Sequence, residues 1–547
     1  MFKIPSFPFF LSFLLYCYPL CIFSLSISDL SLEEKVGQLL LVHFHGDDIN
    51  EEARQLVQEL HVGGIIYYNW ANDLSSPGQV QNLSQGLQQL AQKTSHSIPL
   101  FIAVDQEGGV VNRLKKGFTI FPGHYALGQT GEFQWGEESA WMMGKEMKLV
   151  GISLNLAPVV DIYTQPANPV IGIRAFSSDP FLVAKWGEYA LRGYKKARVI
   201  ATLKHFPGHG DVQVDSHEAL PSIRKKREIL DQIELHPFRI LASQADAIMT
   251  AHLFIPELDR EQCVTFSKKA VDDLLRKEFH FSGIIITDSL AMQGALSQVS
   301  SLEEAVLKSL NAGHDLILLG GKQLLDSQAG LEFTTADIKR VQQFLIDAVK
   351  QGKLSEQRIN ESVARLLDLK KKFGLFDFVP LNPALLKTDL KTAVHCTLAQ
   401  RIAERAIHVV KGQNHLPIGL DDSDSVVIAP DLLREEFMQT DWKKKEILYF
   451  KGLNPDSTSI QEILSSINQK KAVLFTYNAW QFSGQQELFK QIKNHVSSTV
   501  AIVVRNPFDA HDLNIADVIM CTFSPVAVSL QAAFDDLVGK TEKIQQK

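Results

Sequence analysis

The chain of 547 residues is too long for one ordinary domain, and its length favours two or more, among them a barrel of ~250 residues or more. Hydrophobic residues make up 45% and charged residues 21%, a balance that excludes both a disordered chain and a polytopic membrane protein. The net charge of -7 provides no broad basic surface, so we expect no nucleic acid among the partners.

An apolar segment opens the chain. Lys3 is followed by an almost uncharged run over 4–25, which is typical of a secretory signal. Ser24 and Ser26 are small residues at a suitable spacing for cleavage after Ser26, so we predict a signal peptide over 1–26 and an exported protein, periplasmic, at the cell surface or secreted. The run is also long enough to stay in the bilayer as an anchor, and it is the one membrane attachment that we consider.

Short apolar runs then alternate with longer amphipathic segments. Eight of the runs are predicted as strands: 39–43, 62–68, 99–104, 152–160, 199–203, 247–250, 283–287 and 315–319. The predicted helices between them include 51–60, 79–93, 182–196, 226–242 and 268–278. Eight alternating units predict an α/β fold, a closed (β/α)8 TIM-type barrel over 27–377. An open doubly wound sheet is the alternative, but no G-x-G-x-x-G motif follows the first strand.

A second, smaller α/β domain is predicted after the barrel. A long helix is expected over 335–372, and proline and polar residues over 378–392 indicate a linker. Beyond it we expect an α/β sandwich domain over 393–547, with a helix at 398–410. Its predicted strands are 425–428, 472–477, 499–504 and 518–522.

Ionisable residues follow five of the predicted barrel strands. In chain order these are the string from Asp105 to Gly109, then Arg174, the string from Lys204 to Gly210, His252, and Asp288. Barrels of this kind carry their active sites at the carboxyl ends of the strands. We therefore expect these side chains to meet at one end of the barrel.

The loop 208–217 places Asp215 two residues before His217. Histidine and aspartate are ordinary ligands of zinc or manganese, but Lys204 beside His205 would put a cation where the metal should lie. The favoured interpretation pairs the two side chains. A carboxylate on one imidazole nitrogen fixes the tautomer and raises the pKa of the ring, and the other nitrogen is then free to exchange a proton.

Asp288 ends an apolar strand, where an aspartate commonly serves as the N-cap of the next helix. We favour a catalytic role because Arg174, Lys204 and the Asp215/His217 pair are expected nearby. Cations close to a carboxylate keep it ionised and ready to attack.

Three further residues suit the binding of a sugar. The string that begins at Asp105 could be only a tight turn, and Arg113 and Arg174 could be structural ion pairs. An uncompensated acid at the barrel mouth nevertheless suits vicinal sugar hydroxyls, and Arg and Lys suit hydroxyl and amide oxygens.

Four motifs in this order resemble glycoside hydrolase family 3, and within it the bacterial NagZ-type β-N-acetylglucosaminidases (β-hexosaminidases). The motifs are Asp105-Gln106-Glu107-Gly108-Gly109, Val170-Ile171-Gly172-Ile173-Arg174-Ala175-Phe176, Lys204 to Gly210 with Asp215-Ser216-His217, and Thr287-Asp288-Ser289-Leu290-Ala291-Met292. The resemblance implies that Asp288 is the nucleophile, His217 the acid/base and Asp215 the residue that orients it. It also implies that the terminal sugar is bound by Asp105, Arg113, Arg174, Lys204 and His205.

The same resemblance implies a retaining exo-glycosidase that removes terminal β-linked N-acetylglucosamine from peptidoglycan fragments or chitooligosaccharides through a glycosyl-aspartate intermediate. The scheme requires no metal and no organic cofactor. Phosphorolysis alongside hydrolysis is an open outcome, because a neutral base repels phosphate less than a carboxylate does. The alternatives are a β-glucosidase or β-xylosidase of the same family, and a non-catalytic glycan-binding protein on the same fold.

Overall fold

The structure is a computed structural model that describes residues 25–321, 332–420 and 424–540. The predicted signal segment lies outside the described residues except for its last two positions. Among the helices of the described ranges, none is long and apolar enough to cross a membrane.

Eight parallel strands form the barrel of the first domain. They are β1 (Leu40–Val42), β2 (Gly64–Ile66), β3 (Phe101–Val104), β6 (Leu154–Asn155), β7 (Ile200–Phe206), β8 (Ala247–Thr250), β9 (Ile284–Thr287) and β10 (Ile317–Leu318). They pair in the order β10-β1-β2-β3-β6-β7-β8-β9, and a parallel bridge between Ile286 and Leu316 joins the two ends. All eight predicted strands and the barrel are confirmed. Their apolar runs are continuous because helices on the outside and packed side chains inside bury both faces.

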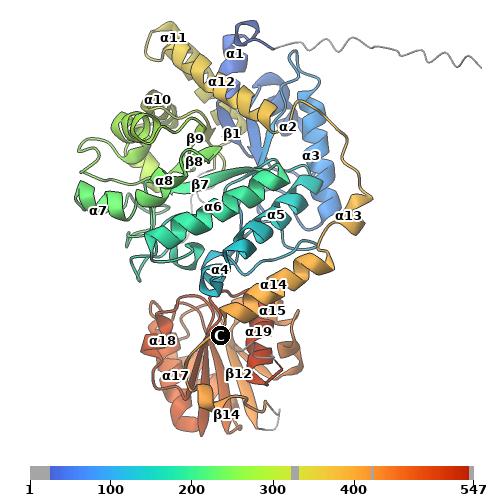
Figure 1. The fold of residues 1–547 in the computed structure, drawn as a ribbon, viewed down its shortest axis with the longest axis vertical. Coiled ribbons are helices and arrows are strands. Elements are labelled where there is room, and N and C mark those ends of the chain that lie inside the picture. The colour runs from blue at the N-terminus through green and yellow to red at the C-terminus, as the bar shows by residue number, and fades with distance from the viewer. Residues whose placement is uncertain (1–24, 322–331, 421–423, 541–547) are drawn as a thin grey trace, which may run out of the picture.

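Helices surround the barrel (Figure 1). They are α1 (Leu32–Gln38), α2 (Glu51–Arg54), α3 (Pro77–Ala91), α4 (His124–Thr130), α5 (Phe133–Leu149), α6 (Pro180–Ala197), α7 (Arg227–Gln232), α8 (His236–Leu241), α9 (Gln293–Leu296), α10 (Leu302–Ala312), α11 (Thr335–Lys350) and α12 (Glu356–Lys372). Wider helical turns at Gln55–Glu59 and Lys269–Glu278 occupy two of the predicted helical segments. A small hairpin, β4 (Gln106–Gly108) with β5 (Val111–Asn112), follows β3.

Two predicted helices are interrupted. The helix expected over 335–372 is two helices, because α11 ends at Lys350 and Gly352 adopts a left-handed conformation with φ +70°. The helix expected over 226–242 is split into α7 and α8, with Pro237 in the first turn of α8. A proline ring clashes with the carbonyl four residues earlier, so the helix cannot continue through Ile233.

The second domain contains a six-stranded sheet with an apolar cluster on each face. Its strands are β11 (His408–Lys411), β12 (Ser425–Pro430), β13 (Ile447–Phe450), β14 (Lys471–Thr476), β15 (Ser498–Val503) and β16 (Val518–Cys521), in the order β11-β16-β15-β14-β12-β13. The longer helices are α14 (Ala393–Ala406), α16 (Ser457–Ser466), α17 (Ser483–His495) and α19 (Ala527–Leu537), with short α15 (Arg434–Phe437) and α18 (Asp509–Asp512) between strands. The predicted α/β sandwich is therefore confirmed.

The sequence patterns misplaced one helix of this domain and missed two of its strands. The helix expected over 398–410 begins at Ala393 and ends at Ala406, and the residues after it form the antiparallel edge strand β11. Strand β13 was not predicted. Both strands lie at the edges of the sheet and are partly exposed. Only two of the four residues of β11 are apolar, whereas β13 is an apolar run throughout that the strand prediction left out.

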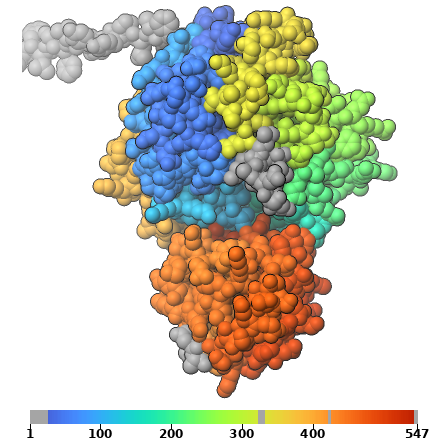
Figure 2. Space-filling view, turned by 180° about the vertical axis from the view of Figure 1, so that it is seen from behind, coloured from blue at the N-terminus to red at the C-terminus, as the bar shows by residue number. Residues whose placement is uncertain are grey.

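The second domain packs directly against the barrel, as the two lobes in Figure 2 show. Within the predicted linker 378–392 lies one short helix, α13 (Leu385–Thr388), and α14 then contacts α4 and α5. The carboxylate of Glu146 on α5 is buried and pairs with Nδ1 of His395 at 2.6 Å. The side-chain amide of Asn506 donates to the carbonyl of Pro166, at 3.2 Å, in the loop after β6. The second domain thus supports a loop at the carboxyl end of the barrel.

A buried carboxylate fastens α12 to the barrel. Asp315, just before β10, is fully buried and accepts a hydrogen bond from the backbone N–H of Ile285 at 3.0 Å. Its side-chain partners are Arg276, Arg358 at 3.3 Å, Arg365 at 2.9 Å and Ser362 at 2.7 Å. Burial would raise the pKa of Asp315, but the three guanidinium groups hold the pKa below its ordinary value.

We predict that Asp315→Asn lowers the free energy of unfolding by about 3 kcal/mol, because removing one partner leaves buried charges uncompensated. Chemical denaturation followed by circular dichroism measures the change. Asp368→Asn, at an exposed position on α12, is the control and should stay within about 0.5 kcal/mol of the wild type. An Asp315→Asn variant as stable as this control would contradict the role of Asp315 in fastening α12 to the barrel.

Candidate active site

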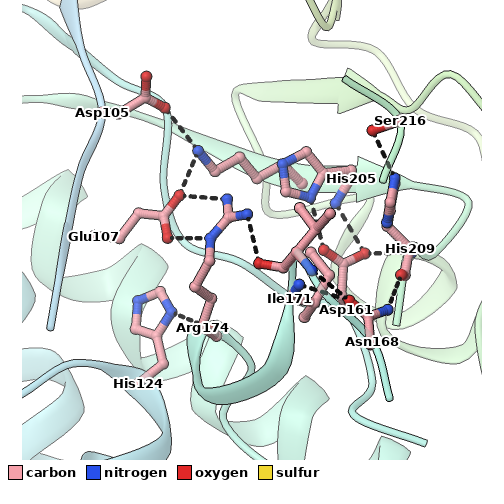
Figure 3. A network of polar contacts seen from close by, with 12 residues as sticks. Asp105, Glu107, His124, Asp161, Asn168, Ile171, Arg174, His205, His209 and Ser216 are labelled. Atoms are coloured by element: carbon pink, nitrogen blue, oxygen red, sulfur yellow. Dashed lines mark hydrogen bonds and ion pairs between the residues drawn. The ribbon is translucent and has the colours of Figure 1, made fainter. Parts of the chain in front are cut away.

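The carboxyl ends of the barrel strands bring the predicted site residues together. Strand β7 extends to Phe206, three residues beyond its predicted end at 203, so Lys204 and His205 are strand residues rather than loop residues. The pairing of β7 with β8 shifts register between Leu203 and Phe206, so regular alternation does not apply to these two side chains, and they have different partners. Lys204 reaches the carboxylates after β3, whereas Figure 3 shows His205 turned towards Asp161.

Two cations and two carboxylates form a buried network. The amino group of Lys204 lies 2.8 Å from Asp105 and 2.7 Å from Glu107. The guanidinium of Arg174 donates two hydrogen bonds to Glu107, at 2.9 and 2.8 Å. Burial would raise the pKa of Glu107, but Arg174 and Lys204 hold it well below its usual range. Arg113 completes the group, 3.7 Å from the second oxygen of Asp105.

The network corrects one prediction and reveals one missed residue. Asp105 was expected to be an uncompensated acid, yet Lys204 and Arg113 both pair with it. Glu107 belongs to the motif from Asp105 to Gly109, but no role was predicted for it. It is the carboxylate that binds both Lys204 and Arg174. Its position in the short strand β4 gave no signal of this, because its partners come from segments distant in sequence, the end of β7 and the 3-10 turn Gly172–Arg174.

Asp161 is a second residue that sequence reasoning missed. It is fully buried after β6, and its carboxylate lies 2.7 Å from Nδ1 of His205. The same side chain accepts from the backbone N–H groups of His205 at 3.1 Å and His209 at 2.7 Å. An aspartate directly after the predicted strand 152–160 was an available signal. It orients the ring of His205 and anchors the start of the loop that carries His217.

Asp215 and His217 form the predicted pair. One carboxylate oxygen of Asp215 lies 2.7 Å from Nδ1 of His217 and also accepts from the backbone N–H of His217 at 2.8 Å. Burial would lower the pKa of His217, but the hydrogen bond and charge of Asp215, together with the charge of Asp288, raise the pKa above its ordinary value. Both side chains remain about one-third exposed, at 34% and 27%. The imidazole is therefore oriented yet accessible.

Backbone hydrogen bonds hold this loop beside the segment that follows Asp288. The carbonyl of Ser216 accepts from Gly294 at 3.0 Å, and the carbonyl of His217 accepts from Gln293 at 3.4 Å. The hydroxyl of Ser216 lies 3.0 Å from Nε2 of His209. The loop is thus attached both to β7 and to the residues after β9.

Asp288 is partly exposed at the end of β9. It is not a helix cap, because the next helix, α9, has Met292 at its N-cap and the Asp288 carboxylate accepts from its neighbour Ser289 at 2.7 Å. Burial would raise the pKa of Asp288, but the imidazoles of His205, His252 and His217 lead the effects that hold the pKa below its ordinary value.

The source of that stabilisation agrees with the prediction for His217 and differs from it for Arg174 and Lys204. Arg174 and Lys204 were expected to keep Asp288 ionised, but both are paired with the carboxylates after β3. His252, to which the sequence assigned no role, is fully buried, and its Nε2 lies 2.9 Å from the carbonyl of Ser289. It thereby fixes the residue that follows Asp288.

Comparison with known proteins shows the family of the chain. Residues 31–369 match the model of the glycosyl hydrolase family 3 N terminal domain. The chain belongs to glycosyl hydrolase family 3. This family 3 chain is 35% identical over 402 residues to "Beta-hexosaminidase A" of Pseudoalteromonas piscicida, a match that covers 70% of the chain and 64% of that relative. The chain thus spans a little under two thirds of that relative's length.

Other relatives of this family 3 chain are similar in sequence and in structure. A "Beta-hexosaminidase" of Pseudomonas aeruginosa is 34% identical over 303 residues, which cover 55% of the chain and 86% of that protein. The solved family 3 β-N-acetylglucosaminidase of Paenibacillus sp. str. FPU-7 has a TM-score of 0.84 and 34% identity, covering 94% of this chain and 97% of that one. The family 3 fold therefore extends over both domains.

We predict that Asp215→Asn lowers the pKa of His217, because the substitution removes the carboxylate charge that raises it. NMR titration of histidine-labelled protein measures the pKa, with the His217→Gln spectrum identifying the resonance. Asp211→Asn is the control. Asp211 is a carboxylate of the same loop that pairs with Lys225 at 2.9 Å, so this substitution should leave the pKa of His217 unchanged. Equal pKa values in the Asp215→Asn variant and the wild type would exclude the pairing in solution.

Proposed function

We propose that the chain is a retaining exo-glycosidase that hydrolyses terminal, non-reducing β-linked N-acetylglucosamine, with Asp288 as nucleophile and His217 as acid/base. The observation that carries the proposal is the position of the Asp215/His217 pair, which backbone hydrogen bonds attach to the segment after Asp288 in a family 3 barrel. The relatives named β-hexosaminidase and the solved β-N-acetylglucosaminidase support the choice of sugar.

In the first step, a carboxylate oxygen of Asp288 attacks the anomeric carbon while the bond from that carbon to the leaving oxygen breaks. Nε2 of His217 gives its proton to the departing oxygen, since Nδ1 is held by Asp215. In the second step, the now neutral ring takes a proton from water as the water oxygen attacks the anomeric carbon and releases Asp288. Two inversions at the same carbon retain its configuration.

The remaining site residues suit the terminal sugar. Asp105 is partly exposed and has Lys204 on one oxygen and Arg113 near the other, so acceptors and donors lie side by side for vicinal hydroxyls. A guanidinium has five N–H donors, and three of those of Arg174 are used by Glu107 and the Val170 carbonyl, which leaves two for the ligand. The ring of His205, oriented by Asp161, presents its Nε2 as a further polar contact.

The substrates that we propose are peptidoglycan fragments or chitooligosaccharides ending in N-acetylglucosamine. The proposal includes export, which rests on the signal-like segment 1–26 of the sequence. An exported enzyme meets peptidoglycan outside the cytoplasm, and the apolar segment is the one attachment to a membrane that the proposal includes. Net negative charge supports the exclusion of nucleic acid from the partners.

The proposal leaves open inorganic phosphate as a second acceptor for the glycosyl group. The base in the second step is a neutral imidazole, which repels an incoming phosphate dianion less than a carboxylate base would. In phosphorolysis a phosphate oxygen replaces water, and the product is the sugar 1-phosphate. Kinetics in the presence and absence of phosphate distinguish this route from hydrolysis.

We expect Asp288→Ala to abolish turnover, and we expect His217→Gln to slow substrates with poor leaving groups far more than substrates with good ones. Without the acid, activated aryl glycosides such as the 2,4-dinitrophenyl derivative should keep much of their rate, whereas alkyl glycosides should lose on the order of 10² to 10⁴-fold, the usual contribution of general acid catalysis. The comparison of kcat/KM across leaving groups measures this. Glu218→Gln, an exposed neighbour, is the control. Equal losses on both leaving groups would rule out the acid role.

We also expect a strong preference for the N-acetylglucosaminide over the glucoside and xyloside in paired p-nitrophenyl assays. The assays are repeated with added phosphate, and chromatography identifies the released sugar as free or phosphorylated. Faster turnover of the glucoside would favour the β-glucosidase alternative, and tight glycan binding without any turnover would favour a binding protein.

A further inference from the structure

Two histidines and a glutamate converge at the rim of the barrel, outside the network described above. His43 and His45 follow β1, and Phe44 between them is fully buried. The alternation of an extended segment places the two imidazoles on the same side. Both direct Nε2 at one oxygen of Glu332, which lies just before α11, and the distance from His43 is 2.7 Å.

These three groups have the composition and spacing of a metal site. Their ligand atoms all lie within 4.8 Å of one another. In a tetrahedral zinc site with bonds of about 2.0–2.1 Å, ligand atoms are roughly 3.4 Å apart, so only small side-chain movements are needed. Two histidines and one carboxylate are an established zinc ligand set that leaves the fourth position open.

Glu52 joins the two segments that supply the three ligands. Glu52 on α2 accepts from the backbone N–H of His45 and from the hydroxyl of Thr335, each at 3.1 Å. It therefore ties the end of β1 to the start of α11, the two segments that supply the ligands. The side chain of His43 is 3% exposed, that of Glu332 28% and that of His45 53%, so a metal ion could enter from the side of His45.

Aromatic rings connect this group to the candidate active site. The ring centroid of Trp70 lies 4.9 Å from that of His43 and 5.6 Å from that of His45. Trp70 stacks on Tyr68 at 5.1 Å, and the guanidinium of Arg113 lies 6.0 Å above the Tyr68 ring. Trp70 and Tyr68 thus lie between the two histidines and Arg113, a residue that we place at the sugar.

We propose that His43, His45 and Glu332 bind one zinc ion at the rim of the barrel. The ion replaces the direct imidazole–carboxylate contacts and fixes the start of α11 to the end of β1. It takes no part in the hydrolytic steps proposed above, and the proposal does not depend on them. An ordinary histidine–glutamate ion pair is the competing explanation.

The test uses the full chain without a polyhistidine tag, stripped with a chelator and titrated with zinc chloride by calorimetry in the absence of sugar. We expect one zinc per chain. His45→Gln, half exposed and so tolerant of substitution, and Glu332→Gln should each weaken zinc binding on the order of 100-fold. X-ray absorption at the zinc edge of the loaded protein should show two imidazole ligands.

Two matched variants make the result decisive. His511→Gln removes a histidine that is 90% exposed in the second domain and should leave zinc binding unchanged. His217→Gln tests whether zinc instead binds at the Asp215/His217 pair. Absence of stoichiometric binding, undiminished binding in the His45→Gln and Glu332→Gln variants, or loss in the His217→Gln variant alone would overturn the proposal. Circular dichroism of each variant confirms that it is folded.

Discussion

The chemistry that we propose depends on one physical constraint, the attachment of the 215–217 loop to the residues that follow Asp288. A loop is ordinarily the most mobile part of a barrel, and a histidine on it has no defined position relative to a strand end. Here two backbone carbonyls of the loop accept from Gln293 and Gly294. At its start, the backbone of His209 is held by buried Asp161. Proton transfer requires the histidine within hydrogen-bond reach of its target, and these contacts make such a geometry attainable.

The carboxylates around the site are of two kinds, which differ in the positively charged groups beside them. Glu107 and Asp105 are neutralised by full cations, Arg174 and Lys204, which gives a rigid, nearly neutral network. Asp288 instead faces imidazoles, whose charge varies with their protonation. An Asp288 paired directly with a guanidinium would be a weaker nucleophile, because a strong ion pair stabilises the carboxylate before it reacts. The arrangement keeps Asp288 ionised without fixing it in such a pair.

Most of the barrel could be predicted because its strands are buried on both faces, so each is a short apolar run ending in a polar residue. The rule that active sites lie at the carboxyl ends then brought Asp105, Lys204, His217 and Asp288 together from distant parts of the chain. Edge strand β11 escaped prediction because only two of its four residues are apolar, whereas edge strand β13 was left out although its four residues are all apolar.

Pairings between side chains were harder to predict. Nothing in the spacing of Arg174 indicates that it binds Glu107 rather than approaching Asp288, because such partners are set by side-chain direction in three dimensions. Asp161 and His252 act on the site through His205 and the Ser289 carbonyl. The sequence shows both residues at strand ends, but it does not show these partners. The group of His43, His45 and Glu332 joins residues from the segment after β1 and from the approach to α11, which are far apart along the chain.

The most direct test of the central claim is a crystal structure of the Asp288→Asn variant with an intact N-acetylglucosamine disaccharide. We expect Nε2 of His217 within about 3 Å of the glycosidic oxygen, and residue 288 on the opposite side of the anomeric carbon. A complex in which the 215–217 loop lies away from the sugar, with another acidic group at the glycosidic oxygen, would contradict the account.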